Sequence, residues 1–405
     1  MGISYIRGLY KSGMLKFPLF IVAFLLCIAT GCKKKIDIPM KDNADKHLVS
    51  ATSLAKLTKA EMVQRANIIQ LSFLSSNVNY DTEFFKIVYR TVFKGDTIEA
   101  SGLIGIPTNG PLQPSIISAQ NVTRFTDSSA PSNFPNSTTG YELLAAMGYV
   151  SIIPDYIGFG SSRDISSPYY VSEYTASPVV DMIKASKEFL ASRKFGTSNR
   201  LFLIGYSAGG FATLSALREI ETNPVHKLSV TAAMAGAGGF DLTTTVNAFL
   251  NKEAPFAPTD YAAYVIHSYN KTYRWNRPWS DFFTPEYSNR IAQLFETGDH
   301  PNLPGDVARV FNPTFLQNLR TDGREVAFKT ALRDNSFLDW YPKTNTRLYH
   351  SLTDELIPYE STQTVFNSFK SKGANVAMVQ VSGGHELAIQ GMIVDALPWI
   401  QSIDK

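Results

Sequence analysis

Ser207 has the setting that most clearly indicates chemistry, because it lies in the small-residue segment GYSAGG that follows the apolar run LFLI. Gly205 and Gly209 let the chain turn sharply from a strand into a helix without a Cβ clash, and such a turn lifts a serine hydroxyl above a sheet. The N–H of Ala208, at the positive end of the new helix, would then face a developing oxyanion. This G-x-S-x-G context predicts a nucleophile at Ser207. The alternative is a small-residue turn that only allows close helix packing.

A serine needs a base to act as a nucleophile, and the base needs an acid that holds its tautomer. Among the six histidines of the chain, only His385 follows a late strand and lies in a glycine-rich turn, VQVSGGHEL. Asp354 directly follows the strand-like segment TRLYH, where a carboxylate can accept the imidazole N–H, and Glu355 is its nearest rival. His350, which ends that segment, is expected to be a packing or hydrogen-bonded residue. The sequence thus predicts Ser207, Asp354 and His385 as catalytic residues.

A sheet must position these residues, and the sequence alternates strand-like and helical segments from residue 114 onward. The strand-like segments before the insertion are PSIISA, YVSIIP, RLFLIGY and LSVTAAMAG. Such alternation, with apolar runs in the strands, predicts an α/β fold with a mostly parallel central sheet and helices on both faces. Before this region, a helix is expected over residues 53–68, and a hairpin over residues 84–107 at the edge of the sheet.

About a hundred residues separate the strand LSVTAAMAG from the strand before Asp354, which is too many for a simple connection. Residues 240–340 are helical in pattern and rich in Tyr, Phe and Trp. We expect them to form a helical cap over Ser207 that provides an apolar substrate pocket. The alternative is that these aromatic residues fill the core of the cap itself, and none of them is assigned to the substrate.

A resemblance to the α/β-hydrolase superfamily is carried by its nucleophile, acid and histidine segments, which here read GYSAGG, HSLTDELIP and SGGHE. A narrower resemblance, to the secretory lipases and their bacterial esterase relatives, is carried by PDYIGFGSSRDISSPYY, VVDMIKASK and LRDNSFLDWYP. Together they cover most of residues 80–400. The resemblance implies an α/β-hydrolase fold with a helical cap insertion, a Ser-His-Asp triad and an acyl-enzyme intermediate.

The chain departs from these relatives at two places. Relatives often carry Gln-His-Gly after the third strand, where a backbone N–H completes the oxyanion hole, whereas this chain has SAQNVT, with Asn121 and Val122 in place of the histidine and glycine. The second oxyanion donor is therefore expected to be a backbone amide near Asn121 or the Asn121 side chain. Ser167 stands where relatives often have a histidine, and Asp155 and Tyr156 are expected to brace that loop.

The first residues of the chain are typical of an export signal. Basic residues precede the apolar stretch FPLFIVAFLLCIATG, which is short for a membrane span. Its end, IATGC, resembles the box of bacterial lipoproteins, which implies a signal peptide over residues 1–31 and a lipidated Cys32 that attaches the protein to a membrane of the bacterial cell envelope. Residues 32–50 are expected to form a flexible tether, and residues 51–405 the hydrolase domain. The alternatives are an uncleaved anchor or an ordinary secretory signal.

Composition and motifs give no indication of a nucleic-acid partner, a metal or a nucleotide cofactor. The chain has 405 residues, of which 44% are hydrophobic, so it is long enough for a large core. It carries 38 basic and 35 acidic residues, and three of the basic ones lie before residue 31, so the remainder is neutral and has no electrostatic footprint for nucleic acid. The sequence contains no HExxH, paired-cysteine or first-turn GxGxxG motif, so neither a metal nor a nucleotide cofactor is expected.

Together these features predict a serine hydrolase that cleaves carboxylic esters in the manner of lipases and esterases, with a small-molecule or lipid ester as substrate. The sequence indicates neither the oligomeric state nor the membrane face. Two alternatives remain open. The same triad serves serine peptidases and acyltransferases, because a fold does not determine the substrate. The other alternative is a tethered binding protein with a vestigial site, since the oxyanion segment departs from the family pattern.

Overall fold

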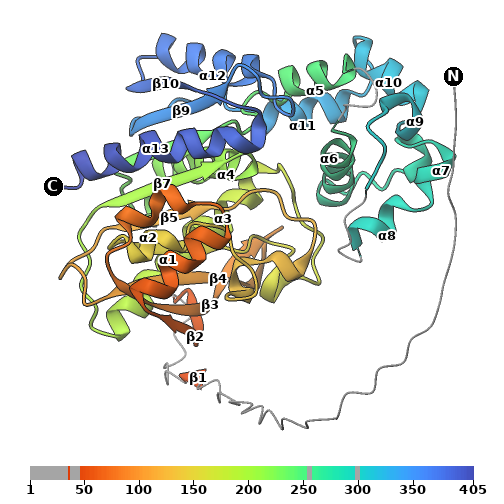
Figure 1. Ribbon diagram of the computed structural model, residues 1–405. Coiled ribbons are helices and arrows are strands. Elements are labelled where there is room, and N and C mark those ends of the chain that lie inside the picture. Colours follow the sequence, from red (N-terminus) through yellow and green to blue (C-terminus); the bar gives the residue numbers. More distant parts are fainter. Residues whose placement is uncertain (1–34, 37–45, 253–257, 297–301) are drawn as a thin grey trace, which may run out of the picture. The chain divides into compact units, whose positions relative to one another are not determined.

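The computed structural model describes residues 35–36, 46–252, 258–296 and 302–405 (Figure 1). All of them belong to one unit of the chain. The expected signal peptide, Cys32 and most of the expected tether lie outside the described residues. No helix within the described part is long and apolar enough to cross a membrane.

One sheet organises the described residues. Its strands are β1 (Lys35–Ile36), β2 (Leu48–Leu57), β3 (Asp81–Phe93), β4 (Asp96–Thr108), β5 (Ile116–Gln120), β6 (Val150–Pro154), β7 (Leu201–Tyr206), β8 (Ala232–Gly236), β9 (Asn345–Ser351) and β10 (Val376–Val381). They lie in the order β1-β2-β3-β4-β6-β5-β7-β8-β9-β10. The strands from β6 to β10 pair in parallel, whereas β1 to β4 form an antiparallel extension that joins β6 through β4.

The order of the strands reverses at β5, which pairs with β6 on one side and with β7 on the other. Every residue of β5, β7 and β8 is buried, as expected for parallel strands covered on both faces. In open α/β sheets, ligands bind outside the carboxyl ends of the strands at such a reversal. The topology therefore directs attention to the ends of β5 and β7, at Gln120 and Tyr206.

Two groups of helices cover the two faces of the sheet. The first group is α3 (Ser172–Ser192), α4 (Ala208–Thr222) and α12 (Tyr359–Ser371). The second group, which Figure 1 shows in part in front of the sheet, is α1 (Lys59–Ile68), α2 (Leu143–Ala146) and α13 (His385–Ile403). Strand β7 illustrates why two cores form, because Leu201 and Leu203 join the first core while Phe202 and Ile204 join the second. The predicted α/β fold, with a mostly parallel sheet between two helical layers, is confirmed.

The N-terminal part differs from the prediction. Instead of one helix over residues 53–68, the segment Leu48–Leu57 is the strand β2, and the helix α1 begins only after a capping box at Thr58. Strand β2 forms because it pairs along its length with β3, a contact distant in the sequence that local helix propensity does not register. The sheet therefore begins within the stretch expected to be a tether, before residue 51.

Strands β3 and β4 form the predicted hairpin, with Lys94 and Gly95 in the turn. Both residues have positive φ angles, 53° and 88°, which match a two-residue type I′ turn. The expectation that this hairpin lies at the edge of the sheet is wrong, because β2 and β1 continue the sheet beyond β3.

Helices occupy the chain between β8 and β9, where a cap was expected over residues 240–340. The described ones are α5 (Leu242–Leu250), α6 (Thr259–Thr272), α7 (Pro285–Ser288), α8 (Ile291–Glu296), α9 (Val307–Val310), α10 (Pro313–Arg320) and α11 (Val326–Asp334). Many of their aromatic side chains pack on one another, as Phe282 does on Phe315 and Phe283 on Phe311. Much of the aromatic content therefore packs within this helical segment, the candidate cap, and a smaller set lines the cavity described below.

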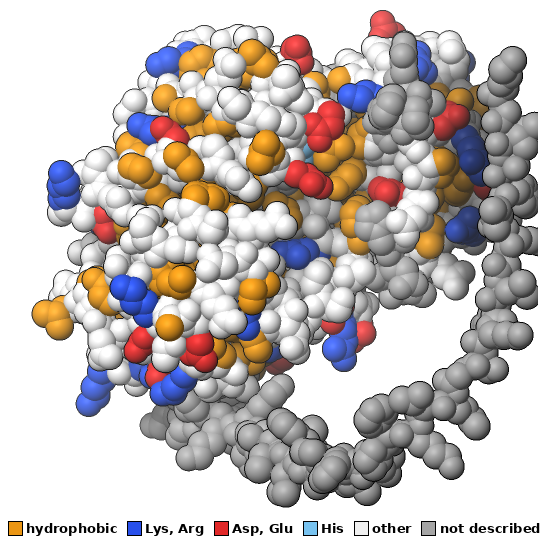
Figure 2. Space-filling view, viewed as in Figure 1, with side chains coloured by type: hydrophobic (Ala, Val, Ile, Leu, Met, Phe, Trp, Pro, Cys, Tyr) orange, Lys and Arg blue, Asp and Glu red, His pale blue; other side chains and the backbone are white. Residues whose placement is uncertain are grey.

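The surface in Figure 2 carries charges of both signs. Lysines and arginines are interspersed with aspartates and glutamates on this face, and hydrophobic side chains lie between them. This mixture agrees with the near balance of 38 basic and 35 acidic residues in the sequence.

Candidate active site

Ser207 lies at the turn between β7 and the first residue of α4. Its φ of 56° and ψ of −128° are unfavourable for a residue with a side chain. The neighbouring glycines are required by space, because a Cβ at Gly205 would lie 2.2 Å from the Gly209 carbonyl oxygen, and a Cβ at Gly209 would lie 2.0 Å from the Gln120 carbonyl oxygen. This close backbone packing holds the Ser207 hydroxyl in one position at the end of the sheet.

His385 is the first residue of α13 and reaches Ser207 from the C-terminal part of the chain. Its Nε2 lies 2.8 Å from the Ser207 hydroxyl oxygen, and its Nδ1 lies 2.7 Å from Oδ2 of Asp354. An ionised carboxylate only accepts hydrogen bonds, so we assign the proton to Nδ1, and Nε2 then accepts from the serine hydroxyl. The structure thus brings together the three residues that the sequence predicts for catalysis.

The Asp354 side chain is completely buried, with 0% of it exposed. Its Oδ1 accepts the backbone N–H groups of Leu356 and Ile357 at 2.9 and 2.8 Å. Burial by itself would raise the pKa of this carboxyl, but hydrogen bonds from His350, His385 and the Ile357 N–H hold the pKa of Asp354 well below its usual value. Asp354 is therefore a carboxylate at neutral pH. A histidine that acts as base for a serine requires such a carboxylate to hold its tautomer and orientation.

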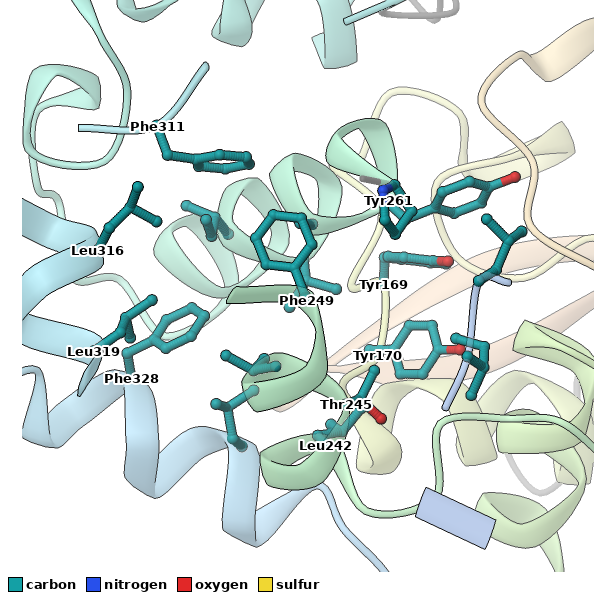
Figure 3. A pocket seen from close by; sticks show the side chains of 18 of the residues that line it. Tyr169, Tyr170, Leu242, Thr245, Phe249, Tyr261, Phe311, Leu316, Leu319 and Phe328 are labelled. Atoms are coloured by element: carbon teal, nitrogen blue, oxygen red, sulfur yellow. The ribbon is translucent and has the colours of Figure 1, made fainter. Parts of the chain in front are cut away.

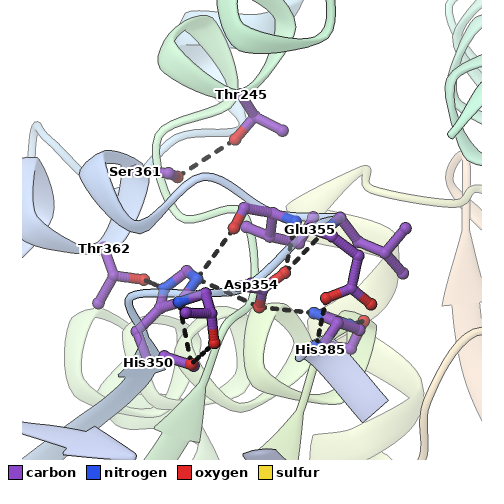
Figure 4. A network of polar contacts seen from close by, with 12 residues as sticks. Thr245, His350, Asp354, Glu355, Ser361, Thr362 and His385 are labelled. Carbon is purple, nitrogen blue, oxygen red and sulfur yellow. Dashed lines mark hydrogen bonds and ion pairs between the residues drawn. The ribbon is translucent and has the colours of Figure 1, made fainter. Parts of the chain in front are cut away.

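His350 is a second histidine on the same carboxylate (Figure 4). Its Nε2 lies 3.3 Å from Oδ2 of Asp354 and 3.0 Å from the Ile357 carbonyl oxygen, and both oxygens only accept, so Nε2 carries the proton. Its Nδ1 then accepts from the Thr362 hydroxyl at 2.6 Å. The sequence expectation of a hydrogen-bonded residue agrees with these contacts but did not connect His350 with Asp354. The sequence did contain a signal for this contact, because His350 lies four residues before Asp354, at the end of the strand that Asp354 follows.

Glu355, the alternative candidate for the acid, contacts the backbone of His385 and not its imidazole ring. Its carboxylate accepts the backbone N–H of His385 at 2.9 Å, where the first turn of a helix leaves donors without an intrahelical partner. Space for this carboxylate depends on Gly384, because a Cβ there would lie 2.6 Å from Glu355 Oε2. Asp354 therefore faces the imidazole ring, and Glu355 anchors the backbone that carries it.

Asn121 follows β5 and is fully buried. Its side-chain amide donates to the Pro154 carbonyl at 2.7 Å, and its amide oxygen accepts from Nε of Arg124 at 3.1 Å. These contacts engage the amide oxygen and one N–H of the Asn121 side chain and hold it toward Pro154 and Arg124. Of the two donors expected in this loop, they favour a backbone amide, acting with the N–H of Ala208 at the start of α4.

Asp155 and Tyr156, which are expected to brace the loop that carries Ser167, also form hydrogen bonds to other parts of the chain around the site. The Tyr156 hydroxyl donates to the Asn121 carbonyl at 3.0 Å. The buried Asp155 carboxylate accepts the Ser101 hydroxyl at 2.5 Å and the Ser132 backbone N–H at 2.8 Å. The loops after β5 and β6 are therefore tied to each other and to the sheet beside Ser207.

A cavity of roughly 900 Å³, counting the part open to solvent, is lined by Ser207, His385 and the helices between β8 and β9. Figure 3 shows side chains such as Phe249 and Leu319 around it. Helices α5, α6, α10 and α11 supply most of its lining. The apolar side chains from these helices are Leu242, Val246, Phe249, Val265, Ile266, Phe315, Leu316, Leu319, Phe328 and Leu332. Such walls suit a hydrocarbon group and leave few partners for a polar one. Within the described part of the chain, no group of three or more His, Cys, Asp or Glu side chains is placed to hold a metal ion.

Comparison with known proteins relates this site to a family. The model of the secretory lipase family matches residues 131–403. A candidate hydrolase from Legionella pneumophila has a similar structure, with a TM-score of 0.81, 26% identity, and coverage of 89% of this chain and 99% of that one. A search of curated protein sequences returned no significant match.

Two further structures support the fold alone, because their identities are low. The ligand-bound rice cell wall degrading esterase LipA from Xanthomonas oryzae has a TM-score of 0.75 and 24% identity, and the match covers 86% of this chain and 96% of that one. Lipase A from Candida antarctica, in its closed state, has a TM-score of 0.67 and 19% identity, with coverage of 88% and 81%. Because the family model spans more than half of the sequence, this chain belongs to the secretory lipase family of α/β-hydrolases.

Proposed function

We propose that this protein is a serine hydrolase that cleaves carboxylic esters. The observation that carries the proposal is the hydrogen-bonded chain from Ser207 through His385 to Asp354, with an apolar cavity beginning at the serine. Family membership supports the same class of reaction, and proteins of similar fold include an esterase and a lipase.

Acylation begins when His385 Nε2 takes the proton of Ser207 and the serine oxygen attacks the carbonyl carbon of the ester. The N–H of Ala208 and a backbone amide of the loop after β5 stabilise the negative charge that develops on the carbonyl oxygen. The tetrahedral intermediate then breaks its bond to the alcohol oxygen, which receives the proton from His385. The acyl group remains on Ser207.

Deacylation repeats these steps with water. His385 takes a proton from the water molecule, whose oxygen attacks the acyl-enzyme carbonyl carbon. The bond to Ser207 breaks, the serine oxygen regains its proton from His385, and the carboxylic acid leaves. Throughout, Asp354 keeps its charge, holds the ring orientation and stabilises the imidazolium that forms twice in each cycle.

The lining of the cavity supports a hydrocarbon acyl group in the substrate. A peptide in this place would bring backbone donors and acceptors next to walls made mainly of Leu, Val and Phe, and unpaired polar groups are costly to bury. This favours esters over peptides among the reactions that the same triad can catalyse. The closely bonded geometry of the three residues likewise favours an active enzyme over a vestigial binding site.

The decisive experiment is active-site labelling of the mature chain, with Cys32 replaced by Ser so that the protein can be purified without a lipid. The folded protein is treated with a fluorophosphonate probe, and the adduct is located by mass spectrometry beside a panel of p-nitrophenyl esters from acetate to palmitate. We expect label on Ser207 and turnover of esters, and we expect both to disappear in Ser207→Ala. A folded wild type that takes no label and hydrolyses no ester would refute the proposal.

We further propose that the protein is exported and anchored in a bacterial membrane by a lipidated Cys32. Membership in a secretory family supports export. Mass spectrometry of the full-length protein purified from membranes should show an acylated N-terminal peptide beginning at Cys32, and Cys32→Ala should abolish the modification. An unmodified mature N-terminus in the wild type would contradict the anchor.

A further inference from the structure

A second hollow adjoins the catalytic cavity, and Tyr169 and Tyr170 line both spaces. It measures roughly 430 Å³ with its open part included. Its walls come from the loop after β5, the loop after β6 and the start of α4, where Ala208 is one of the lining residues. Because Ala208 follows the candidate nucleophile directly, this hollow lies next to the place that the reacting carbonyl would occupy.

Arg124 lines this hollow and brings a positive charge into it. Its Nε donates to the amide oxygen of Asn121, and no described residue forms a hydrogen bond or ion pair with its two terminal amino groups. The side chain is half-buried, and although burial lowers the pKa of its guanidinium, the ordinary pKa of arginine is so high that the group stays charged. Arg124 therefore presents hydrogen-bond donors of a fixed planar group that the described protein leaves unused.

Two buried carboxylates, Glu142 and Asp155, attract the Arg124 guanidinium at longer range, but both accept their hydrogen bonds from other groups. Glu142 accepts hydrogen bonds from the loop just before it, and Asp155 accepts from two serines. Neither carboxylate lies within ion-pair distance of Arg124 in the described structure. A partly buried cation without a direct anionic partner is unfavourable, so an anion bound in the hollow would gain a strong interaction.

The remaining walls offer hydroxyl groups and aromatic faces. The hydroxyls of Thr123 and Tyr169, two residues that line the hollow, are hydrogen-bonded to each other at 2.7 Å. The Tyr169 ring stacks on Tyr264 of α6, with 4.3 Å between the ring centroids. Phe159 and Phe211 supply apolar surface. A flat group that carries a charged or hydroxylated substituent matches these walls better than a plain alkyl chain does.

We propose that this hollow, the Arg124 pocket, binds the alcohol part of the substrate through an anionic oxygen group, a carboxylate or a phosphate. The inference rests on the proposed ester hydrolysis. The apolar cavity accommodates the acyl chain, which leaves the space beside Ala208 for the other substituent of the carbonyl carbon. A guanidinium recognises such anions through paired, charge-assisted hydrogen bonds.

The test uses butyrate esters of three phenols that differ in one substituent: 3-hydroxybenzoate, 3-hydroxyphenyl phosphate and the neutral 3-hydroxybenzamide. The measured quantity is kcat/KM for each anionic ester divided by kcat/KM for the neutral one, with the mature protein. We expect the wild type to prefer an anionic ester and Arg124→Met to lower this ratio by about 10- to 100-fold, because charge-assisted hydrogen bonds are lost. Arg124→Lys should keep part of the preference, and the two anionic esters tell a carboxylate from a phosphate ligand.

Arg163→Met is the matched control, because Arg163 is an exposed cation in the loop after β6, and it should leave the ratio unchanged. If Arg124→Met lowers turnover of all three esters by the same factor, Arg124 only supports Asn121 and the proposal fails. A wild type without preference for either anionic ester overturns it as well.

Failure of the proposed hydrolysis would look different, since the wild type would then turn over none of the three esters. The pocket is tested in that case by calorimetric titration of Ser207→Ala with 3-hydroxybenzoate and with inorganic phosphate. Binding that Arg124→Met abolishes supports the anion site. The absence of any binding refutes it.

Discussion

The buried Asp354 carboxylate is the charged centre of the candidate site. Two backbone N–H groups and two imidazoles surround it, and its two oxygens divide these donors between them. The Ser207 hydroxyl, the candidate reacting group, is hydrogen-bonded to His385, and His385 is hydrogen-bonded to this buried carboxylate. The buried charge therefore fixes the position of the hydroxyl through the imidazole ring. Two predictions follow at this scale, one for acid stability and one for His350.

The first prediction concerns acid stability. The pKa of Asp354 is lower in the folded protein than its ordinary value of 3.8, so its ionisation stabilises the native state above that pH, and this contribution is lost as the pH falls toward the folded pKa. We expect the free energy of unfolding of Asp354→Asn to lie below that of the wild type at neutral pH. The difference should narrow between about pH 4 and pH 2. Urea unfolding at several pH values measures it, and a difference independent of pH would contradict the assignment.

The second prediction assigns His350 the role of a positioning residue. His350→Leu removes a donor to the Asp354 carboxylate, and we expect kcat to fall by about 10- to 100-fold with little change in KM, the scale of a lost hydrogen bond to a charged group. His350→Gln, whose amide places a donor near the original Nε2, should recover most of the loss. Val365→Ala, a core variant in α12 outside this network, serves as a control for destabilisation. Equal losses in the Leu and Gln variants would rule out the role.

At the scale of elements, the site depends on how closely β5, β7 and α4 approach one another. The reversal of strand order places the ends of β5 and β7 side by side, and the first turn of α4 passes directly over the end of β5. The candidate nucleophile at the end of β7 and the loop at the end of β5, where the second oxyanion donor is expected, are thereby held within one closely packed junction. The acid comes from the loop after β9, and the histidine from the first residue of α13, the helix that follows β10; β9 and β10 are parallel neighbours on the far side of β8.

The third prediction tests this junction. Gly209→Ala places a Cβ 2.0 Å from the Gln120 carbonyl oxygen, so the helix or the strand must move. We expect a loss of about 3 kcal/mol or more in the free energy of unfolding, with loss of fluorophosphonate labelling at Ser207. Gly196→Ala is the control, since its nearest neighbours would lie at 3.7 Å, and it should change stability by less than about 0.5 kcal/mol. A Gly209→Ala protein as stable and reactive as the wild type would show that the junction is not tightly packed.

At the scale of the whole molecule, the apolar cavity lies between the sheet and the helices of the candidate cap. Ser207 and His385 come from the sheet domain, while helices between β8 and β9 close the cavity above them. Figure 3 shows Leu316 and Phe311 on the side of the cavity opposite Tyr169 and Tyr170. We therefore expect the cap helices to determine which acyl chain lengths the enzyme accepts, and the sheet domain to provide the residues that react.

The fourth prediction addresses this division. Leu316→Trp adds bulk to the cap side of the cavity, and we expect kcat/KM for p-nitrophenyl palmitate to fall at least 10-fold relative to the acetate, because a filled pocket rejects the longer chain by more than about 1.4 kcal/mol. Leu338→Trp, at a position 38% exposed and outside the cavity, is the control and should leave the chain-length profile unchanged. If Leu316→Trp also leaves the chain-length profile unchanged, the acyl chain does not bind in this part of the cavity.

Several features of the fold and site were accessible from the sequence because they depend on local chemistry. Short stretches of sequence were enough to identify three features: the glycines around Ser207, the acid after a strand, and the histidine in a glycine-rich turn. The alternating strands and helices, the hairpin turn at Lys94 and Gly95, and the helical character of the cap segment are local in the same way. For these, short-range propensity and spacing agree with the final structure.

What the sequence by itself determined is therefore the fold class and the three candidate catalytic residues. Tertiary structure alone decided the pairing of β2 with β3, the contact of His350 with Asp354, the engagement of the Asn121 side chain, and the open donors of Arg124. The pairing of β2 with β3 and the hydrogen bond from the Asn121 side chain to Pro154 join distant parts of the chain, and the contact of His350 with Asp354, only four residues apart, depends on how the loop after β9 folds. Their energies come from pairing and burial, which no local pattern encodes, so only the folded chain could assign them.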